Sequence, residues 1–345
     1  MEVTRDTAQS GSGGLAALAA SLASRLVDDN VDNNLVFSPL SIYAALALLA
    51  AGVRGATLDE ILGVLGAPSH AALDEFLSHV VEDVLEDRAE SGGPRVVFAC
   101  SVWAVLTCPL KPAYHRAPAS TYKADASTVD FCNNPEAARG QINVWVAQVT
   151  RKLIGSVLGP GSITPLTRAM LSNAMYFKGK WEKPFRKKRT ADKLFHQLNG
   201  RVVGVPFMQS RSSQFIAVHD GFKVLKLRYQ MAQAQPPSRT RGGFRVPKFK
   251  LSFHRSVVSI IKKLGLRLPF NDQVNLSVMA VIEVNEEGTE AAAVTLMDME
   301  IGCSRIPSPP PRVDFVADHP FAYFIVEEAT DAVVFVGYVL DPSAI

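Results

Sequence analysis

The chain has 345 residues, of which 48% are hydrophobic and 20% are charged, and its formal net charge at pH 7 is +3. This length is sufficient for a large hydrophobic core and for one or two domains. The basic residues are dispersed, which argues against nucleic acid as a partner because nucleic-acid binding needs a basic face. No stretch reaches about 18 uninterrupted apolar residues, so we expect no membrane-spanning segment.

The cysteines and the start of the chain indicate the compartment. Cys100, Cys108, Cys132 and Cys303 show neither CxxC nor Cys/His metal-ligand spacing. We therefore expect free thiols, and no metal or other cofactor. Residues 1–14 are polar and are expected to be flexible, and the apolar run that follows is broken by two serines and an arginine, unlike a signal-peptide core. These features predict a cytosolic or nuclear protein.

The first part of the chain is typical of helices. Periodicity predicts a helix over 14–28, and a short strand at 33–37 leads into a second helix at 40–51. Ser38 or Ser41 can cap that helix, with Pro39 in its first turn. Because 40–51 is almost wholly apolar, we expect this helix to be buried on all sides. Further helices are predicted at 57–65, with Thr57 and Glu60 as a capping box, and at 70–88.

Two later segments are typical of strands covered on both faces. Residues 96–106 and 168–177 are apolar at nearly every position, as such strands require. Helices are predicted around them at 111–122 and 135–153, together with a short strand at 128–131. The rest of the chain alternates between strands and turns.

The remaining elements complete a mixed α+β pattern. Short strands are predicted within 195–208, 215–229, 244–253 and 313–316, a helix at 257–264, and a hairpin formed by 321–326 and 331–339. Residues 231–243 carry glutamines, two prolines, arginines and two glycines, and indicate a loop or linker.

The segment 281–311 begins as a strand and continues as a loop. From Thr289 to Met299, one alternating phase carries no charge, whereas the other phase holds Glu290, Asp298 and Glu300. This segment could therefore become a strand with one buried face. The alternative interpretation is a plain Ala-rich linker or short helix.

Five segments of the sequence carry a resemblance to a known family. They are Asn34-Leu35-Val36-Phe37-Ser38-Pro39-Leu40-Ser41, Asn143-Val144-Trp145-Val146, Leu171-Ser172-Asn173-Ala174-Met175-Tyr176-Phe177-Lys178-Gly179-Lys180-Trp181, Glu283-Val284-Asn285-Glu286-Glu287-Gly288-Thr289-Glu290-Ala291-Ala292-Ala293, and Asp314-Phe315-Val316-Ala317-Asp318-His319-Pro320-Phe321 with Phe335-Val336-Gly337. In this order and over nearly the whole chain, they resemble the serpins, and most of all the plant serpins of the Z type.

The resemblance implies one domain over 1–345, with helices packed on three β-sheets and an exposed reactive-centre loop. It implies a hinge and loop over 286–312, in which the hinge consists of Glu286, Glu287, Gly288, Thr289, Glu290, Ala291, Ala292 and Ala293. It also implies a serine-type endopeptidase inhibitor rather than an enzyme: a suicide substrate whose cleaved loop inserts into the main sheet. The implied partner is a trypsin-like serine protease or a papain-like cysteine protease, the implied state is a monomer, and the family allows an extracellular location.

Three departures from the family pattern favour a non-inhibitory serpin-like protein as the alternative. The linker over 230–243 is shorter than the family's connection, which includes a central strand. The stretch 269–281 is compressed, and the distal loop carries Leu296, Asp298 and Glu300 where plant relatives favour small apolar residues. A gene-model error is another explanation for the missing core segments.

The bait bond has two candidates. Counting forward from Gly288 places it at Gly302–Cys303, and counting back from Val313 places it at Arg305–Ile306, which would suit a trypsin-like enzyme. Cys303 is interpreted as an inert exposed thiol rather than a reactive one.

Two other polar features are interpreted as structural. His319 lacks a partner nucleophile in the sequence, so we expect a turn residue there. A basic cluster around Lys187 is interpreted as a solvated turn rather than as a site for a polyanion.

Overall fold

The computed structural model describes residues 2–30, 32–108, 124–210, 214–230, 243–270, 274–288 and 313–344. The helices of this part are α1 (Glu2–Asp28), α2 (Pro39–Ala50), α3 (Ala56–Leu65), α4 (His70–Asp83), α6 (Pro135–Val149) and α7 (Val258–Lys263). The strands are β1 (Leu35–Phe37), β2 (Arg95–Val105), β3 (Ala124–Val129), β4 (Ala169–Lys178), β5 (Ala191–His196), β6 (Val202–Ser210), β7 (Phe215–His219), β8 (Phe222–Lys226), β9 (Phe244–Pro247), β10 (Phe249–Ser256), β11 (Val274–Val284), β12 (Phe315–Val316), β13 (Phe321–Glu327) and β14 (Ala332–Val339).

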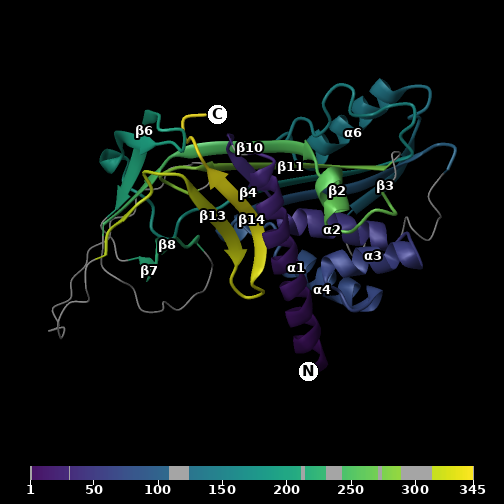
Figure 1. Cartoon of the computed structure of the whole chain (residues 1–345), viewed down its shortest axis with the longest axis horizontal. Coiled ribbons are helices and arrows are strands. Elements are labelled where there is room, and N and C mark those ends of the chain that lie inside the picture. Colours follow the sequence, from purple (N-terminus) through teal and green to yellow (C-terminus); the bar gives the residue numbers. More distant parts are fainter. Residues whose placement is uncertain are drawn as a thin grey trace.

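The two apolar strands predicted from the sequence, β2 and β4, lie inside a five-stranded sheet. The strand order is β10-β11-β4-β2-β3, and β4 is buried along almost its whole length. One face of this sheet packs on a core built with α1, α2 and the β1-β14-β13 sheet. A smaller core lies on the other face, under α6, where the Trp103 and Trp145 rings meet edge to face. Figure 1 shows these layers above and below the sheet.

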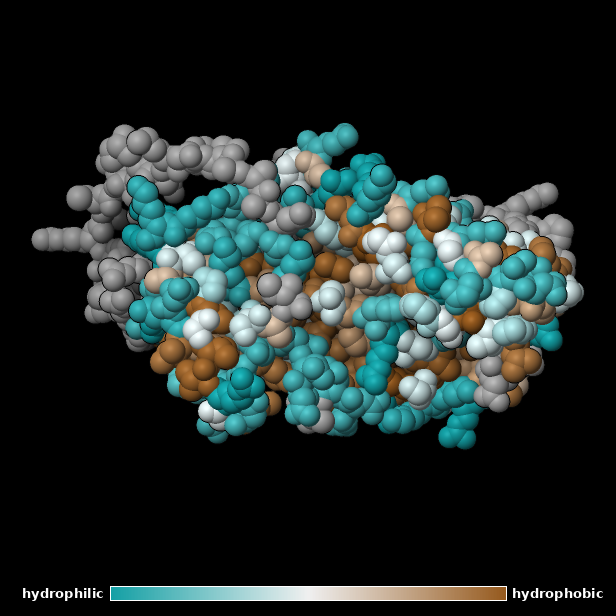
Figure 2. Space-filling model, turned by 90° about the horizontal axis from the view of Figure 1, so that it is seen from above, coloured by the Kyte–Doolittle hydropathy of each residue, from teal (hydrophilic) through white to brown (hydrophobic). Residues whose placement is uncertain are grey.

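The outer face of the sheet is only partly covered. In Figure 1, α6 lies over the end of the sheet that is farther from β6. Figure 2 looks down on this face and shows apolar side chains in its middle, among polar ones at the rim.

Helix α2 holds the centre of the inner core. Ser38 is its N-cap and accepts a hydrogen bond from the Ser41 N–H at 3.1 Å, while Pro39 occupies the first turn. Asn173 on β4 donates its side-chain amide to the Ser41 carbonyl at 2.6 Å. The predicted all-round burial of this helix and its cap are confirmed.

The other strands form three smaller sheets: β1-β14-β13, β12-β9-β6-β5 and the β7-β8 hairpin. The α+β class and the predicted hairpin of β13 and β14 are confirmed. The expected three sheets become four among the described residues, because no ladder joins β8 to β13.

The segment before β1 is bound to the segment after β14 through one side chain. Asn34 donates to the Asp341 carbonyl at 2.6 Å and accepts hydrogen bonds from the Leu340 and Asp341 N–H groups at 2.8 and 2.9 Å. This contact extends the pairing of β1 with β14. The first strand of the chain therefore depends on the last.

Several predicted elements need correction. Helix α1 begins at Glu2 rather than at residue 14, so the polar start of the chain belongs to a helix. Helix α3 follows Gly55 without a side-chain cap, so the predicted Thr57 capping box is wrong. Glu60 instead accepts hydrogen bonds from the N–H groups of Arg267 and Leu268, at 2.9 and 2.8 Å.

The region from 244 to 256 also differs from the prediction. The expected single strand is divided between two sheets at Lys248: β9 ends at Pro247 in the β12-β9-β6-β5 sheet, and β10 begins at Phe249 in the five-stranded sheet. The stretch expected to be compressed, 269–281, contains most of β11, which is an intact strand of eleven residues. The helix predicted at 111–122 lies outside the described residues.

Candidate functional site

The ladder between β4 and β11 is the centre of the candidate site. The two strands are parallel and pair from Val274 opposite Ala169 to Val281 opposite Tyr176. Beyond that point β11 continues to Val284 beside β10, and β4 continues to Lys178 beside β2. The five-stranded sheet therefore has a seam that is paired along most of its length and ends before its strands do.

The chain leaves the seam through a tight turn at 285–288. The Asn285 N–H donates to the Gly288 carbonyl at 2.8 Å, and the Asn285 side chain accepts from the Glu287 N–H at 3.0 Å. Gly288 forms a bridge with Lys180, just after β4, and has a φ of +149°. A Cβ at Gly288 would lie 1.9 Å from the Gly179 carbonyl oxygen, so only glycine fits here.

Trp181 fixes this turn to the end of β4. Its backbone N–H donates to the Glu287 carbonyl and its indole N–H donates to the Asn285 carbonyl, both at 2.9 Å. The indole stacks on Tyr229, with ring centroids 4.6 Å apart. Because the ring is 6% exposed, these contacts are shielded from water.

Glu286 is a buried carboxylate, 6% exposed, that holds the turn from the other side. It accepts a hydrogen bond from the Thr190 hydroxyl at 2.8 Å and pairs with the Lys248 ammonium at 3.1 Å. Burial alone would raise the pKa of Glu286. Hydrogen bonds from the backbone, Thr190 and Lys248 outweigh burial, so the pKa lies below its ordinary value of 4.5.

Glu287 makes the second ion pair, with Lys187 at 2.8 Å. The hydrogen bond to Glu287 raises the pKa of Lys187 above its ordinary value of 10.5. Lys187 belongs to the basic cluster that the sequence suggested was only a solvated turn. The cluster folds as a short 3₁₀ turn beside the hinge, so sequence reasoning missed this contact. The charge complementarity of Glu286-Glu287 with that cluster was the available signal.

The other predicted site residues fall into two groups. Glu286, Glu287 and Gly288 come together at the end of the seam, as described. The other hinge residues, Thr289, Glu290, Ala291, Ala292 and Ala293, and both candidate bonds, at Gly302, Cys303, Arg305 and Ile306, lie outside the described residues.

The other chemically notable side chains do not form a catalytic group. His319 pairs with Asp318 at 2.8 Å and stacks on His196, as a turn residue would. Cys100 is buried, which raises the pKa of its thiol to about 12 although hydrogen bonds partly oppose this. Among the described side chains, no group of three His, Cys, Asp or Glu is placed to hold a metal ion. None of the described helices has the length and hydropathy needed to cross a membrane.

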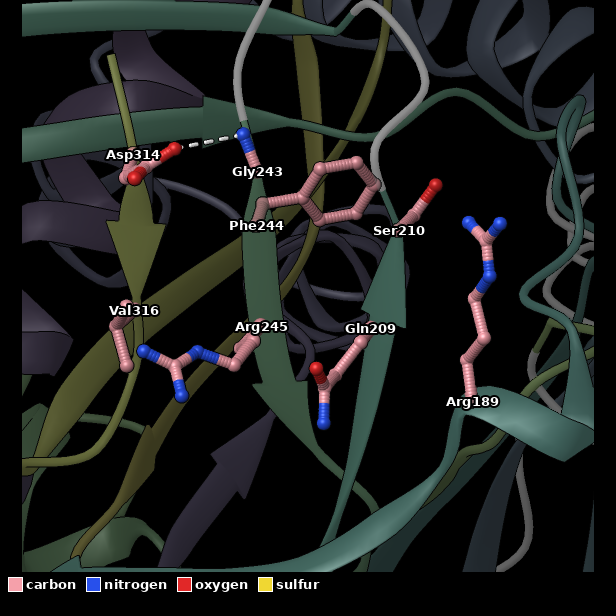
Figure 3. Close-up of a pocket in the computed structure, with 8 residues that line it drawn as sticks. All are labelled: Arg189, Gln209, Ser210, Gly243, Phe244, Arg245, Asp314 and Val316. Atoms are coloured by element: carbon pink, nitrogen blue, oxygen red, sulfur yellow. Dashed lines mark hydrogen bonds between the residues drawn. The ribbon is translucent and has the colours of Figure 1, made fainter.

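A cleft of about 540 Å³ lies where the chain re-enters the described structure before β12. Figure 3 shows Asp314 bound to the Gly243 N–H on one side, Arg245 reaching toward Val316, and Arg189 on the far side. The Asp314 bond is 2.8 Å long and joins the start of β12 to the start of β9. Both ends of the segment 289–312 are thus fixed: one at the seam and the other at the β12-β9-β6-β5 sheet.

Comparison with known proteins identifies the family. The family model of the serpins (serine protease inhibitors) matches residues 14–236 and 230–342. Serpin-Z2B of Oryza sativa subsp. japonica is 42% identical, with 96% of this chain and 98% of the relative covered, and Serpin-Z2A of the same plant is 40% identical, with 96% and 97% covered.

The structural comparison agrees with the sequence comparison. The native stressed conformation of Arabidopsis AtSerpin1 superposes with a TM-score of 0.86 at 32% identity, covering 97% of this chain and 98% of that one. The chain therefore belongs to the serpin family, a family of serine protease inhibitors and not of enzymes.

Proposed function

We propose that the chain inhibits a serine-type endopeptidase as a suicide substrate, by offering residues 289–312 as bait and inserting them between β4 and β11 after cleavage. The observation that carries this proposal is the seam itself. Its two strands are parallel neighbours, and the chain leaves one of them at a turn fastened to the end of the other.

The topology of the seam suits an inserted strand. A segment that folds back after Gly288 would run antiparallel to β11 and also to β4, because those two strands are parallel. One parallel ladder would then be replaced by two antiparallel ladders, which are slightly more stable per residue. Insertion therefore adds backbone hydrogen bonds without exposing any strand edge.

The pattern of side chains in the loop also suits this position. On β11, Leu276, Val278 and Ala280 face the inner core and are at most 3% exposed. The uncharged phase of the loop, from Thr289 to Met299, could take the equivalent positions without burying a charge. The phase with Glu290, Asp298 and Glu300 would then lie on the outer face.

The proposed inhibition depends on movement of the loop after the protease has cleaved it. The protease serine attacks the carbonyl carbon of the bait bond, the peptide nitrogen leaves as a new amino terminus, and an ester joins the inhibitor to the protease. Insertion of the loop would carry the ester-linked protease along the sheet before water can hydrolyse the ester. The turn at 285–288 would be the pivot of that movement.

The test is to incubate the full chain with a trypsin-like protease and with papain, and to separate the products on a denaturing gel. We expect a covalent complex with one of them, and sequencing of the released peptide will distinguish Gly302–Cys303 from Arg305–Ile306. Cleavage should also raise the melting temperature, because the loop joins the sheet. Cleavage without either a complex or a rise in melting temperature would contradict the proposal.

A non-inhibitory binding protein is the second candidate. It is favoured by the absence of a ladder between β8 and β13, which leaves a sheet edge open elsewhere in the molecule. Under this alternative the gel shows only cleaved chain with every protease of the panel.

A further inference from the structure

A groove with a volume of about 1910 Å³ separates β8 from β13. Among the described residues β8 pairs only with β7, and β13 pairs only with β14, so each presents its other edge to the groove. Figure 1 shows the β7-β8 hairpin standing apart from the β13-β14 hairpin. A groove flanked by two unpaired strand edges has backbone donors and acceptors along both walls.

The two walls run in the same direction. At one end, the Lys223 ammonium donates to the Asp314 carbonyl at 2.9 Å. At the other end, Lys226 and Arg228 both pair with Glu328, at 3.1 and 2.9 Å. Residue numbers therefore increase from the first end to the second along β8, and also along the segment from Asp314 to Glu328 that contains β13. A strand running the opposite way between them would pair in antiparallel fashion with each.

The dimensions fit one strand. β13 has seven residues, which span about 23 Å at roughly 3.3 Å per residue. A strand of that length, about 4.8 Å wide and about 10 Å deep with its side chains, occupies roughly 1,100 Å³. The groove is large enough for such a strand.

The lining selects an uncharged, apolar occupant. Phe177, Trp181, Phe249 and Ile282 line the groove on the side of the core. Val224 and Phe324 on its walls are 44% and 59% exposed, so their apolar surface would be covered by an occupant. Lys223 is hydrogen-bonded to the Asp314 carbonyl, and Lys226 and Arg228 pair with Glu328, so these four charged side chains offer little to a charged ligand.

The chain's own segment 231–242 has the wrong composition for this position. It leaves the described structure after Gln230, on the side of Glu328, and returns at Gly243, which is bonded to Asp314. Its sequence holds two prolines, which lack N–H groups, two arginines, and a single apolar side chain larger than alanine other than proline, Met231. Such a segment offers no run of large apolar side chains at alternate positions, which the apolar lining of the groove would favour.

We infer that the groove between β8 and β13 binds an extended peptide segment of a partner protein, about seven residues long, uncharged and apolar at alternate positions. The peptide would complete one sheet from β7 to β1 by backbone pairing on both edges. This inference does not depend on the proposed inhibition, because the walls of the groove are β8 and β13, whereas the strands of the seam are β4 and β11.

The test uses a fluorescein-labelled, end-capped heptapeptide with the sequence Thr-Val-Thr-Phe-Thr-Val-Thr and measures its anisotropy with the full chain. The control peptide has the same sequence with N-methyl groups on alternate residues, which removes half of the backbone donors. We expect saturable binding of the first peptide, and binding of the control that is weaker by at least about tenfold.

Two variants in the groove and one matched control outside it test where the peptide binds. Val224→Asp and Phe324→Asp should each weaken peptide binding at least about tenfold, because the peptide would bury an unpaired carboxylate. Leu194→Asp, a change at an equally exposed leucine on β5, should leave binding unchanged. Circular dichroism of each variant checks the fold. No binding of the peptide, or an equal loss with Leu194→Asp, would overturn the inference.

Two other occupants are separate outcomes of the same test. Replacement of 231–242 by a Gly/Ser linker of equal length should leave the peptide affinity unchanged. A gain of about tenfold or more would mean that the chain covers its own groove, and would overturn the inference. A dimer in sedimentation that Phe324→Asp converts to a monomer would assign the groove to a second copy instead.

Discussion

The molecule contains two pairs of strands that run side by side in the same direction, β4 with β11 and β8 with β13. The first pair is joined by a ladder of eight residue pairs, whereas among the described residues no ladder joins the second pair, and Lys223, Lys226 and Arg228 contact Asp314 and Glu328, which lie outside β13. Both pairs have the geometry to accept an antiparallel strand between them. The pairs differ in whether the backbone N–H and C=O groups of the two strands are hydrogen-bonded to each other before a third strand is added.

This difference separates a closed seam, at which we propose that a strand inserts, from a groove that is already open. At the seam, β4 and β11 bond each other, and the turn at 285–288 closes the remaining opening with two ion pairs and Trp181. At the groove, β8 has only its hairpin partner, so apolar surface stays open to solvent. The predictions that follow test the two sites, from the largest expected effect to the smallest.

The largest effect is expected from a charge placed on the uncharged phase of the loop, which we propose is buried by insertion. Thr289→Arg should abolish the covalent complex and leave simple cleavage, because insertion would bury an unpaired guanidinium at a cost of several kcal/mol. Glu290→Arg is the matched control, since its side chain belongs to the phase expected to face outward. The measurement is the fraction of inhibitor in complex on a denaturing gel. A complex that survives Thr289→Arg would rule out insertion in this phase.

The next effect concerns the fit of the turn against β4. Gly288→Ala should destabilise the chain by about 2–3 kcal/mol, because the new Cβ would meet the Gly179 carbonyl and the backbone conformation is strained. Gly200→Ala is the control, since Gly200 also has a positive φ, of +80°, but has open space around it. Denaturant unfolding measures both. Equal losses would show that strain, rather than the close approach, makes glycine necessary at 288.

A smaller, pH-dependent effect is expected at Glu286. Its pKa is lower in the folded chain than its ordinary value of 4.5, so its contribution to stability is full above that value and is lost as the pH falls through the folded pKa. Glu286→Gln should therefore lower the melting temperature at pH 7, and the difference should vanish in acid.

The control for Glu286 is Glu283→Gln. Glu283 pairs with Lys250 at 3.4 Å, and both side chains are exposed, so the loss at pH 7 should be smaller. A Glu286→Gln variant with the same melting temperature as the parent chain at pH 7 would show that the carboxylate does not hold the turn.

The smallest effect on stability is expected at the groove between β8 and β13. Phe324→Lys should change the free energy of unfolding by no more than about 0.5 kcal/mol, because Phe324 is 59% exposed on an unpaired wall. The same change at Ala280 on β11, which is 2% exposed, should unfold the chain. Thermal unfolding of the two variants makes the comparison, and a large loss with Phe324→Lys would mean that the groove is closed in solution.

Much of the fold could be predicted because local signals and burial agree. The apolar runs of α2, β2 and β4 predicted their burial, and the residues of the hinge predicted its place after a strand. The Ser38 cap was predictable because the side chain and the N–H it binds are three residues apart.

Other features depend on contacts between distant segments. Glu60 fits a capping box by spacing, but the loop that follows α7 presents two N–H groups to it, some 207 residues away along the chain. The pairing of Lys187 with Glu287 likewise joins two separate segments. The division of 244–256 between two sheets depends on Pro247 and on the Lys248 N–H, which bonds Pro206 across the β9-β6 pair. Sequence alternation alone does not show these choices.

The Asn34 contacts set a limit on the order of folding. The Asn34 side chain is hydrogen-bonded to Leu340 and Asp341, which lie 306 and 307 positions later in the chain. Among the described strands, β1 pairs only with β14. During synthesis, β1 leaves the ribosome long before β14 exists. The β1-β14-β13 sheet, and the inner core that it closes, can therefore form only after β14 has been made. Until then α2 has no β14 to pack against, so removal of residues 336–345, which takes away half of β14, should leave the inner core open and prevent stable folding.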